Sequence, residues 1–292
     1  MLVNTDYLLI MEIANELKIV RWGVDKYNEW ILSGSPENTK VIYLDISSNQ
    51  IKGSLVLTNL LNLQILDCSF NQITEIELNL PNLQTLNCSF NKITKIQTLK
   101  LLKLQALNYS SNQITTIEGL NLPNLQTLYC GYNQITTIEG LNLPNLQELN
   151  CSSNKITTIE GLQLPNLQRL YCGYNQITTI EGLELPNLQA LNCDSNQITT
   201  IEGLELPNLQ ILYCNNNQIT KIEGLESPNL QTLDCRNNQI TTIEGLELPN
   251  LQALNCNNNQ ITTVAFMLPN TLQMLYYRGN PVEHIAPNIQ RF

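Results

Sequence analysis

The stretch that decides the fold reads Leu125-Gln126-Thr127-Leu128-Tyr129-Cys130-Gly131-Tyr132-Asn133. Apolar residues occupy its first, fourth and sixth positions, and asparagine occupies the ninth. Leu128 and Cys130 lie two residues apart between polar positions, which is the alternation typical of a half-buried strand. We therefore expect a short strand here, followed by a turn at the asparagine.

The same nine-residue frame returns along most of the chain. Counted on its asparagine, the first two intervals are 22 and 20 residues, and the other nine are 21 residues. One such turn buries about six Leu or Ile and gains on the order of 10 kcal/mol, whereas ordering its backbone costs about 20 to 40 kcal/mol. The turns must therefore stack, with each strand pairing to the next in a parallel sheet. The frame asparagines are Asn49, Asn71, Asn91, Asn112, Asn133, Asn154, Asn175, Asn196, Asn217, Asn238, Asn259 and Asn280.

From about Val41 to Asn280 the frame resembles the LxxLxLxxN pattern of leucine-rich-repeat proteins. The rest of each turn, for example Gln134-Ile135-Thr136-Thr137-Ile138-Glu139-Gly140-Leu141, is similar to the short internalin-type class, and similar repeats occur in giant-virus proteins. The resemblance implies the α/β horseshoe class. It implies a right-handed solenoid of about 12 turns, mostly β and coil, with a parallel β-sheet on the concave face and an extended or 3-10 convex face. It also implies a ladder of frame asparagines.

The outer side of each turn is unsuited to an α-helix. After Asn133, β-branched threonines, Gly140 and Pro144 interrupt the apolar residues, so we expect an extended or 3-10 segment. A glycine recurs after the outer glutamate, where the backbone needs positive φ. The 20-residue turn has Glu77-Leu78-Asn79 in its place, and we expect a local irregularity there. The recurring glycines are Gly119, Gly140, Gly161, Gly182, Gly203, Gly224 and Gly245.

The two ends of the chain depart from the repeat, and we interpret them as caps. We predict a helical N-terminal cap at residues 1–40, the solenoid at 41–280 and a C-terminal cap at 281–292. Caps cover the apolar core and unpaired strand edges that terminal turns would otherwise expose. The N-terminal cap rests on N-cap residues, a stripe at helical spacing and two tryptophans: Asn4 to Asp6, Ile10, Ile13, Ala14, Leu17, Trp22 and Trp30. The C-terminal cap rests on Pro281, Val282, Ile285, Ile289 and Phe292.

Nine cysteines all fill the sixth frame position, which Ile46, Tyr109 and Tyr277 fill in the other turns. Such a position belongs to the core, where a free cysteine behaves as a small hydrophobe. The chain has no CxxC pair, and a straight row of sulfurs cannot form a tetrahedron, so we predict no metal site and no cofactor. Neighbouring strands are close enough for disulfides, but the odd count and the absence of a secretory-type leader favour reduced thiols. We therefore expect a cytoplasmic protein, in the host cytoplasm if it is viral.

Charge and composition exclude several function classes. The chain is 42% hydrophobic with a formal net charge of -10, which weighs against disorder and against a nucleic-acid partner. No apolar run is long enough to span a membrane. The single histidine, His284, lies beside Glu283 without a nucleophile nearby, so we predict a surface residue, no catalytic residues and no enzyme.

Acidic residues stack on the outer side, turn after turn. We interpret them as a solvated face that keeps a repetitive protein soluble, with a calcium site as the alternative. They are Glu118, Glu139, Glu160, Glu181, Glu202, Glu223 and Glu244, joined by Glu184, Glu205, Glu226 and Glu247.

The third and fifth frame positions should point to solvent on the concave side, where a partner would meet them. Tyrosine alternates with asparagine in the fifth column, and the third column places Glu148 beside Arg169 on neighbouring turns. Tyrosine and arginine supply many binding hot spots because they bury large areas and keep a polar tip. The predicted partner-binding residues are Tyr129, Tyr132, Glu148, Arg169, Tyr171, Tyr174 and Tyr213.

Duplication of a two-turn unit would produce the same alternation without selection, and the sequence leaves both interpretations open. We favour a non-catalytic scaffold or adaptor, monomeric or weakly self-associating, that binds a protein on the concave face. The alternatives are a self-associating structural component and a regulatory or recognition subunit of an enzyme supplied in trans. A peptide or a carbohydrate on the tyrosine face is also compatible with the sequence, because the fold alone does not choose among these functions.

Overall fold

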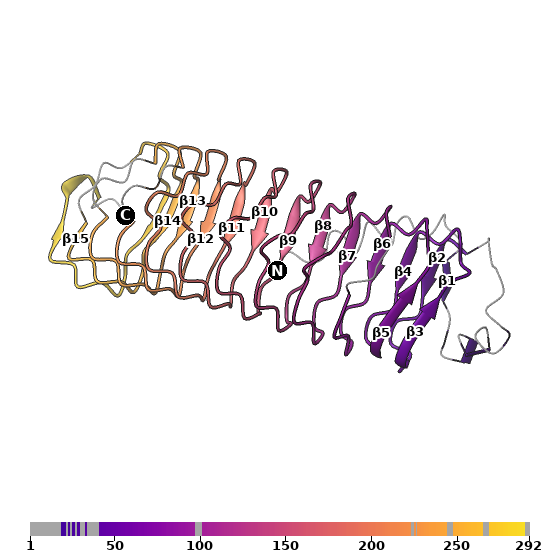
Figure 1. The fold of residues 1–292 in the computed structure, drawn as a ribbon. Helices are drawn as coiled ribbons and strands as arrows, with labels where there is room; N and C mark the ends of the chain where they lie inside the picture. Colours follow the sequence, from indigo (N-terminus) through magenta and orange to yellow (C-terminus); the bar gives the residue numbers. More distant parts are fainter. Residues whose placement is uncertain are drawn as a thin grey trace. The chain divides into compact units, whose positions relative to one another are not determined.

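The computed structural model describes most of the chain as short strands joined by extended segments (Figure 1). The described residues are 19–21, 23, 25–26, 28–29, 33, 41–96, 101–222, 225, 227–243, 248–264 and 269–289. They fall into two compact units. The first unit comprises residues 1–115 and 120–133, and the second comprises residues 116–119 and 134–292.

In the first unit, six strands form a parallel sheet in the order β1-β2-β4-β6-β7-β8. Strands β3 and β5 pair in a separate sheet on the outer side of the same turns. The strands are β1 (Ile19–Arg21), β2 (Tyr43–Asp45), β3 (Lys52–Leu57), β4 (Ile65–Asp67), β5 (Gln72–Leu78), β6 (Thr85–Asn87), β7 (Ala106–Asn108) and β8 (Thr127–Tyr129).

In the second unit, a parallel sheet runs in the order β9-β10-β11-β12-β13-β14-β16, and β15 pairs with β17. The elements are β9 (Glu148–Asn150), β10 (Arg169–Tyr171), β11 (Ala190–Asn192), β12 (Ile211–Tyr213), β13 (Thr232–Asp234), β14 (Ala253–Asn255), β15 (Thr263–Val264), β16 (Met274–Tyr276), β17 (His284–Ile285) and the 3-10 helix η1 (Pro287–Ile289). The predicted solenoid, with one short parallel strand per turn, is confirmed.

Each main-sheet strand from β4 onward covers the third to fifth frame positions. In β10, Leu170 is fully buried and both of its neighbours are half-buried, as the alternation of a strand requires. Leu170 pairs with Leu149 on one side and with Leu191 on the other, so like positions meet along the sheet. The core of each unit therefore consists of continuous columns of the same residue type.

The outer corners follow the predicted pattern. Gly140, Gly161 and Gly182 have φ of 69°, 69° and 68°, a left-handed conformation that favours glycine. Gly224 and Gly245 lie outside the described residues. The outer glutamates that the structure describes, Glu118, Glu139, Glu160, Glu181, Glu184, Glu202 and Glu205, are exposed. The acidic outer face is thus confirmed for those seven, while Glu223, Glu226, Glu244 and Glu247 fall outside the description.

The 20-residue turn, which has Leu78 where other turns have a corner glycine, differs as its sequence predicts. Its outer side is β5, which runs through Glu77 to Leu78 and pairs with β3. The register of this pair shifts between Gly53 and Ser54. The predicted irregularity is therefore present, and paired extended strands replace the glycine corner.

The caps are described only in part. The predicted helix residues of the N-terminal cap and both tryptophans lie outside the described residues. Within the same cap, the described strand β1 pairs in parallel with β2. At the other end Ile289 is buried in η1, as predicted, and His284 is exposed, also as predicted. Ile285 in β17 is 38% exposed and pairs with Val264 in β15 of the preceding turn, and its predicted part in the cap stays a prediction. Phe292 lies outside the description.

Within the described ranges, no helix combines the length and apolar character needed to cross a bilayer. The same residues contain no group of three or more His, Cys, Asp or Glu side chains placed to hold a metal ion.

Candidate partner-binding surface

The frame asparagines form a ladder beneath the end of each strand. Asn175 accepts a hydrogen bond at Oδ1 from the Ile156 N–H at 3.0 Å. Its Nδ2 donates to the carbonyl oxygens of Cys151 at 3.1 Å and Cys172 at 3.0 Å. A short amide thus satisfies backbone groups of two adjacent turns at once. The predicted ladder is confirmed, and it fixes the position of the strands that carry the exposed side chains.

The cysteines form a second ladder inside the core. Each one is at most 1% exposed and none forms a disulfide. The Cys172 Sγ donates to the Asn192 carbonyl oxygen on the next turn at 3.3 Å, and Cys88 does the same to Asn108 at 3.4 Å. Burial raises the pKa of the Cys151 thiol to about 12. The prediction that these cysteines are buried core residues is confirmed.

On the opposite side of the sheet from this core, the third and fifth frame positions form a surface that we call the strand face. Glu148 and Arg169 lie opposite each other on β9 and β10. Arg169 donates from Nε at 2.8 Å and from Nη2 at 2.7 Å, both to Oε2 of Glu148. The arginine side chain is 43% exposed and the glutamate side chain is 14% exposed. The pair therefore presents a guanidinium plane to a partner while the carboxylate is largely covered.

Tyr171 lies next to this ion pair, at the other end of β10. Burial raises the pKa of its phenol, the negative charge of Glu148 raises it further, and Arg169 lowers it. Tyr213 lies two strands away in the same column, with Asn192 between them. Both phenols are therefore available to a partner beside a fixed guanidinium. The structure thus brings together four of the predicted residues, Glu148, Arg169, Tyr171 and Tyr213, within the second unit.

Tyr174 lies beyond the strand, at the eighth frame position. Its φ is 56°, and its side chain is 61% exposed. Its N–H donates to the Asp194 carbonyl oxygen at 2.9 Å, which anchors the backbone while the ring projects outward. A Cβ at the preceding Gly173 would meet the Asp194 carboxylate, which would have to turn aside.

The remaining two predicted residues belong to the first unit and are described there. Tyr129 is half-buried at the end of β8. Tyr132 repeats the geometry of Tyr174, with φ of 55° and 68% exposure. All seven predicted residues therefore have at least part of their side chain exposed to solvent.

A family model described as "Leucine Rich repeats (2 copies)" matches five successive segments of the chain. These are residues 61–101, 102–143, 144–185, 186–227 and 228–270. The chain belongs to the leucine-rich-repeat family. No curated protein matches it.

Solved leucine-rich-repeat structures similar to this chain include bacterial proteins. It is 31% identical to the functional domain of InlJ from Listeria monocytogenes, with a TM-score of 0.68, over 76% of this chain and 50% of that one. It is 29% identical to YopM from Yersinia enterocolitica, with a TM-score of 0.62, over 85% of this chain and 62% of that one. The internalin InlF of L. monocytogenes is 25% identical, with a TM-score of 0.57, over 80% of each chain. The resemblance to internalin-type repeats is thus confirmed, although this chain spans only half the length of the InlJ chain.

The InlJ structure is described as including a cysteine ladder. The sulfurs of this leucine-rich-repeat chain likewise lie at one position of the repeat, in nine of its turns. The ladder is accordingly a structural device shared between the two proteins, which agrees with the buried thiols described above.

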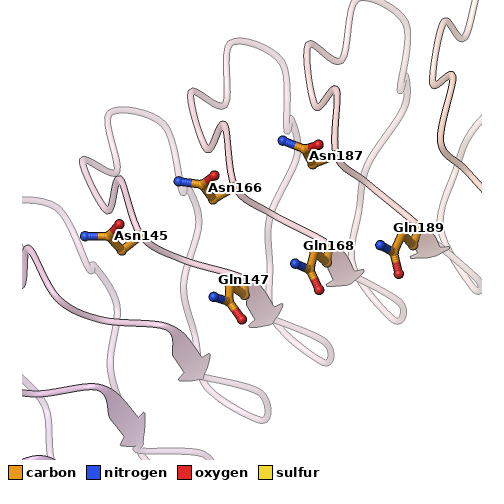
Figure 2. A pocket seen from close by; sticks show the side chains of 6 residues that line it. All are labelled: Asn145, Gln147, Asn166, Gln168, Asn187 and Gln189. Carbon is orange, nitrogen blue, oxygen red and sulfur yellow. The ribbon is translucent and has the colours of Figure 1, made fainter.

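Two exposed features of this leucine-rich-repeat chain were not among the residues that we selected from the sequence. Phe70 and Phe90, both exposed and at positive φ, stack with ring centroids 4.3 Å apart and an interplanar angle of 8°. The second feature is a depression bordered by asparagine and glutamine amides in the second unit (Figure 2). The amides of this depression leave a signal in the sequence. Pro-Asn-Leu-Gln recurs before most strands of the main sheet, although only its leucine is buried.

Proposed function

We propose that this leucine-rich-repeat chain is a non-catalytic scaffold that binds a protein partner on the strand face. The observation that carries the proposal is the Arg169 guanidinium, held by Glu148 through two short bonds beside Tyr171. Its side chain loses little conformational entropy on binding because it is already ordered. Tyr213 extends this contact area, and Tyr174 supplies a further exposed aromatic ring in the same unit. In the first unit, Tyr129 offers a half-buried ring and Tyr132 an exposed one.

The partner proposed here is a protein rather than a nucleic acid. The formal net charge of -10 repels phosphate backbones, whereas tyrosine and arginine are enriched at protein interfaces. The nine reduced thiols support a reducing compartment such as the cytoplasm as the place where the protein works.

The test combines a charge reversal with a truncation on the strand face. The variant Arg169→Glu/Tyr171→Ala should lose partners that the parent chain captures from its native cell. A purified partner should then bind the variant at least about tenfold more weakly, because two hot-spot side chains are removed. The matched control is Lys155→Glu/Thr157→Ala, which changes exposed residues on another side of the same unit and should keep full binding. Equal capture by both variants, each with the thermal stability of the parent, would refute the proposal.

A further inference from the structure

The depression in Figure 2 has a lining of one chemical kind. Its volume is about 400 Å³, and six primary amides line it, two from each of three successive turns. They are Asn145, Gln147, Asn166, Gln168, Asn187 and Gln189. The asparagines lie in the turn before each strand, and the glutamines lie at the second frame position, just before β9, β10 and β11. We call this surface the amide groove.

The asparagines of the groove are fixed in place. Asn166 donates from Nδ2 to the Pro144 carbonyl oxygen at 2.8 Å, and Asn187 donates in the same way to Pro165 at 2.8 Å. One N–H of each of these two amides is therefore used to join two turns. Within the described part of the chain, no hydrogen bond is made by the second N–H or the oxygen of Asn166 and Asn187, and Figure 2 shows the three groove asparagines in the same orientation from turn to turn.

The glutamines provide the remaining hydrogen-bonding capacity. The side-chain amides of Gln147, Gln168 and Gln189 make no hydrogen bond to any part of the chain that the structure describes. Each offers two donors and an acceptor. A protein that needed only solubility at these positions would be served equally well by charged side chains, which occur on the outer face. The groove instead combines many neutral donors and acceptors at a fixed spacing.

This spacing constrains the shape of a ligand. Adjacent parallel strands lie about 4.8 Å apart, so like amides recur at that step along the groove. An extended peptide presents like side chains about every 6.6 Å and drifts out of register within two turns. A polyproline helix repeats about every 9 Å, which is close to two turn steps, so its equivalent groups would meet only every second turn. Hexose rings joined by equatorial 1,4 linkages advance by close to one turn step per ring. Successive rings face opposite ways, but both edges of each ring carry hydroxyl groups that donate and accept, so every turn meets a hydroxyl group.

We propose that the amide groove binds a neutral, linear, β-1,4-linked hexose polymer, with one sugar ring for each turn. The ring hydroxyls accept from the free N–H groups and donate to the Oδ1 and Oε1 atoms. The same pair of amides continues on the next three turns of the second unit, at Asn208 and Gln210, Asn229 and Gln231, and Asn250 and Gln252, all exposed. Six turns therefore match a hexasaccharide.

The test uses cellohexaose, titrated into the full chain by calorimetry. It should bind saturably, and cellobiose should bind at least about tenfold more weakly because it reaches only two turns. Maltohexaose has the same composition but an axial linkage that curls the chain, so it should not bind. A Gln147→Ala/Gln168→Ala/Gln189→Ala variant should weaken cellohexaose binding at least about tenfold, because three amides are removed.

The control variant is Gln176→Ala/Gln197→Ala/Gln218→Ala. It removes the same three amides at the same spacing from exposed positions after the frame asparagines, on another side of the turns. It should bind cellohexaose like the parent, and both triple variants should keep the parent's thermal stability. The Arg169→Glu/Tyr171→Ala variant should also bind the sugar, which separates this site from the proposed protein-binding face. The inference is overturned if cellohexaose does not saturate the chain, if maltohexaose binds as well, or if the control variant loses binding equally.

Discussion

In the first unit, the outer side of two consecutive turns is a pair of strands, β3 and β5, whereas in the second unit the same side of the turns at Gly140, Gly161, Gly182 and Gly203 is an extended segment ending in a left-handed glycine. The strand side of the turns does not change between these regions. Asn91 in the first unit and Asn175 in the second make the same set of ladder bonds. The asparagine and cysteine ladders therefore define the fold, while the outer corner can adopt more than one backbone conformation.

The largest expected loss of stability comes from removing an asparagine of the ladder, which both units share. Asn175→Ala leaves the Ile156 N–H and carbonyl groups of two turns unsatisfied in a buried site, and should lower the free energy of unfolding by about 4 kcal/mol. Asn91→Ala should cost the same amount in the first unit. Urea denaturation followed by circular dichroism measures both values. The exposed Asn142→Ala should change stability by less than about 0.5 kcal/mol, and a similar small loss in Asn175→Ala would contradict the structural role of the ladder.

The cysteine column gives the next prediction. Because burial raises the pKa of Cys151 to about 12, compared with about 8.5 for a free thiol, its thiolate fraction at neutral pH falls by about a thousandfold. Ellman titration of the native protein should therefore detect almost no reactive thiol, whereas the protein in guanidinium chloride should show all nine. Rapid labelling of several thiols in the native state would show that the column is open to solvent.

The outer corner of the second unit should respond more weakly. Gly182 has φ of 68° and empty space around its α-carbon, so Gly182→Ala should cost about 1 kcal/mol from backbone strain alone. Gly182→Asn should cost less, since asparagine tolerates this conformation. At the equivalent position of the first unit, Leu78→Gly should lower stability by about 1 kcal/mol, because Leu78 ends the extended strand β5 and glycine is unfavourable in a strand. Thermal denaturation measures the three variants, and a gain in stability in Leu78→Gly would show that the two corners are built alike.

The smallest effect concerns pH. Burial raises the pKa of the Asp194 carboxyl, although hydrogen bonds from Ser195 and Asn192 and the charge of Arg236 oppose the shift. A carboxyl whose folded pKa is raised favours folding when protonated, so this contribution is fully present below the unfolded pKa of about 3.9 and is lost as pH rises through the folded value.

Asp194→Asn should therefore reduce the fall in melting temperature between about pH 4 and pH 7. An asparagine can be accommodated at position 194, since Asn215 occupies the same frame position in the next turn and is buried. Glu202→Gln, which removes an exposed outer carboxylate, is the control for net charge and should leave the slope nearly unchanged. An unchanged slope in the Asp194→Asn variant would assign the pH dependence to other groups.

The sequence predicted the strand side of the fold almost completely, because every turn repeats the same constraints. Leu, Cys and Asn recur at fixed places, so a single frame located the strands, the core and both ladders. The pair β3 and β5 was foreseen only as an irregularity, since a missing glycine indicates that a corner differs without indicating which extended partner replaces it. The pairing of β17 with β15 joins residues of neighbouring turns near the C-terminal cap, which no local pattern reveals.

The candidate site was predictable in part. Glu148 and Arg169 were placed together because equal spacing puts them on adjacent strands, and the structure adds that both arginine nitrogens share one carboxylate oxygen. The amide groove was not predicted, because Asn and Gln at turns are usually structural or solvated. Only the stacking of the turns brings these six side chains together along one depression.

The constancy of the ladder bonds has a consequence for how such a gene changes. The bonds between turns join the same two frame positions in each pair of neighbouring turns, so removing or inserting one whole repeat brings equivalent atoms back into the same contacts. Unequal recombination between the nearly identical coding segments would then lengthen or shorten the protein without disturbing its core, whereas a deletion of any other length would break the register. Lineages carrying this gene should therefore differ by entire repeats.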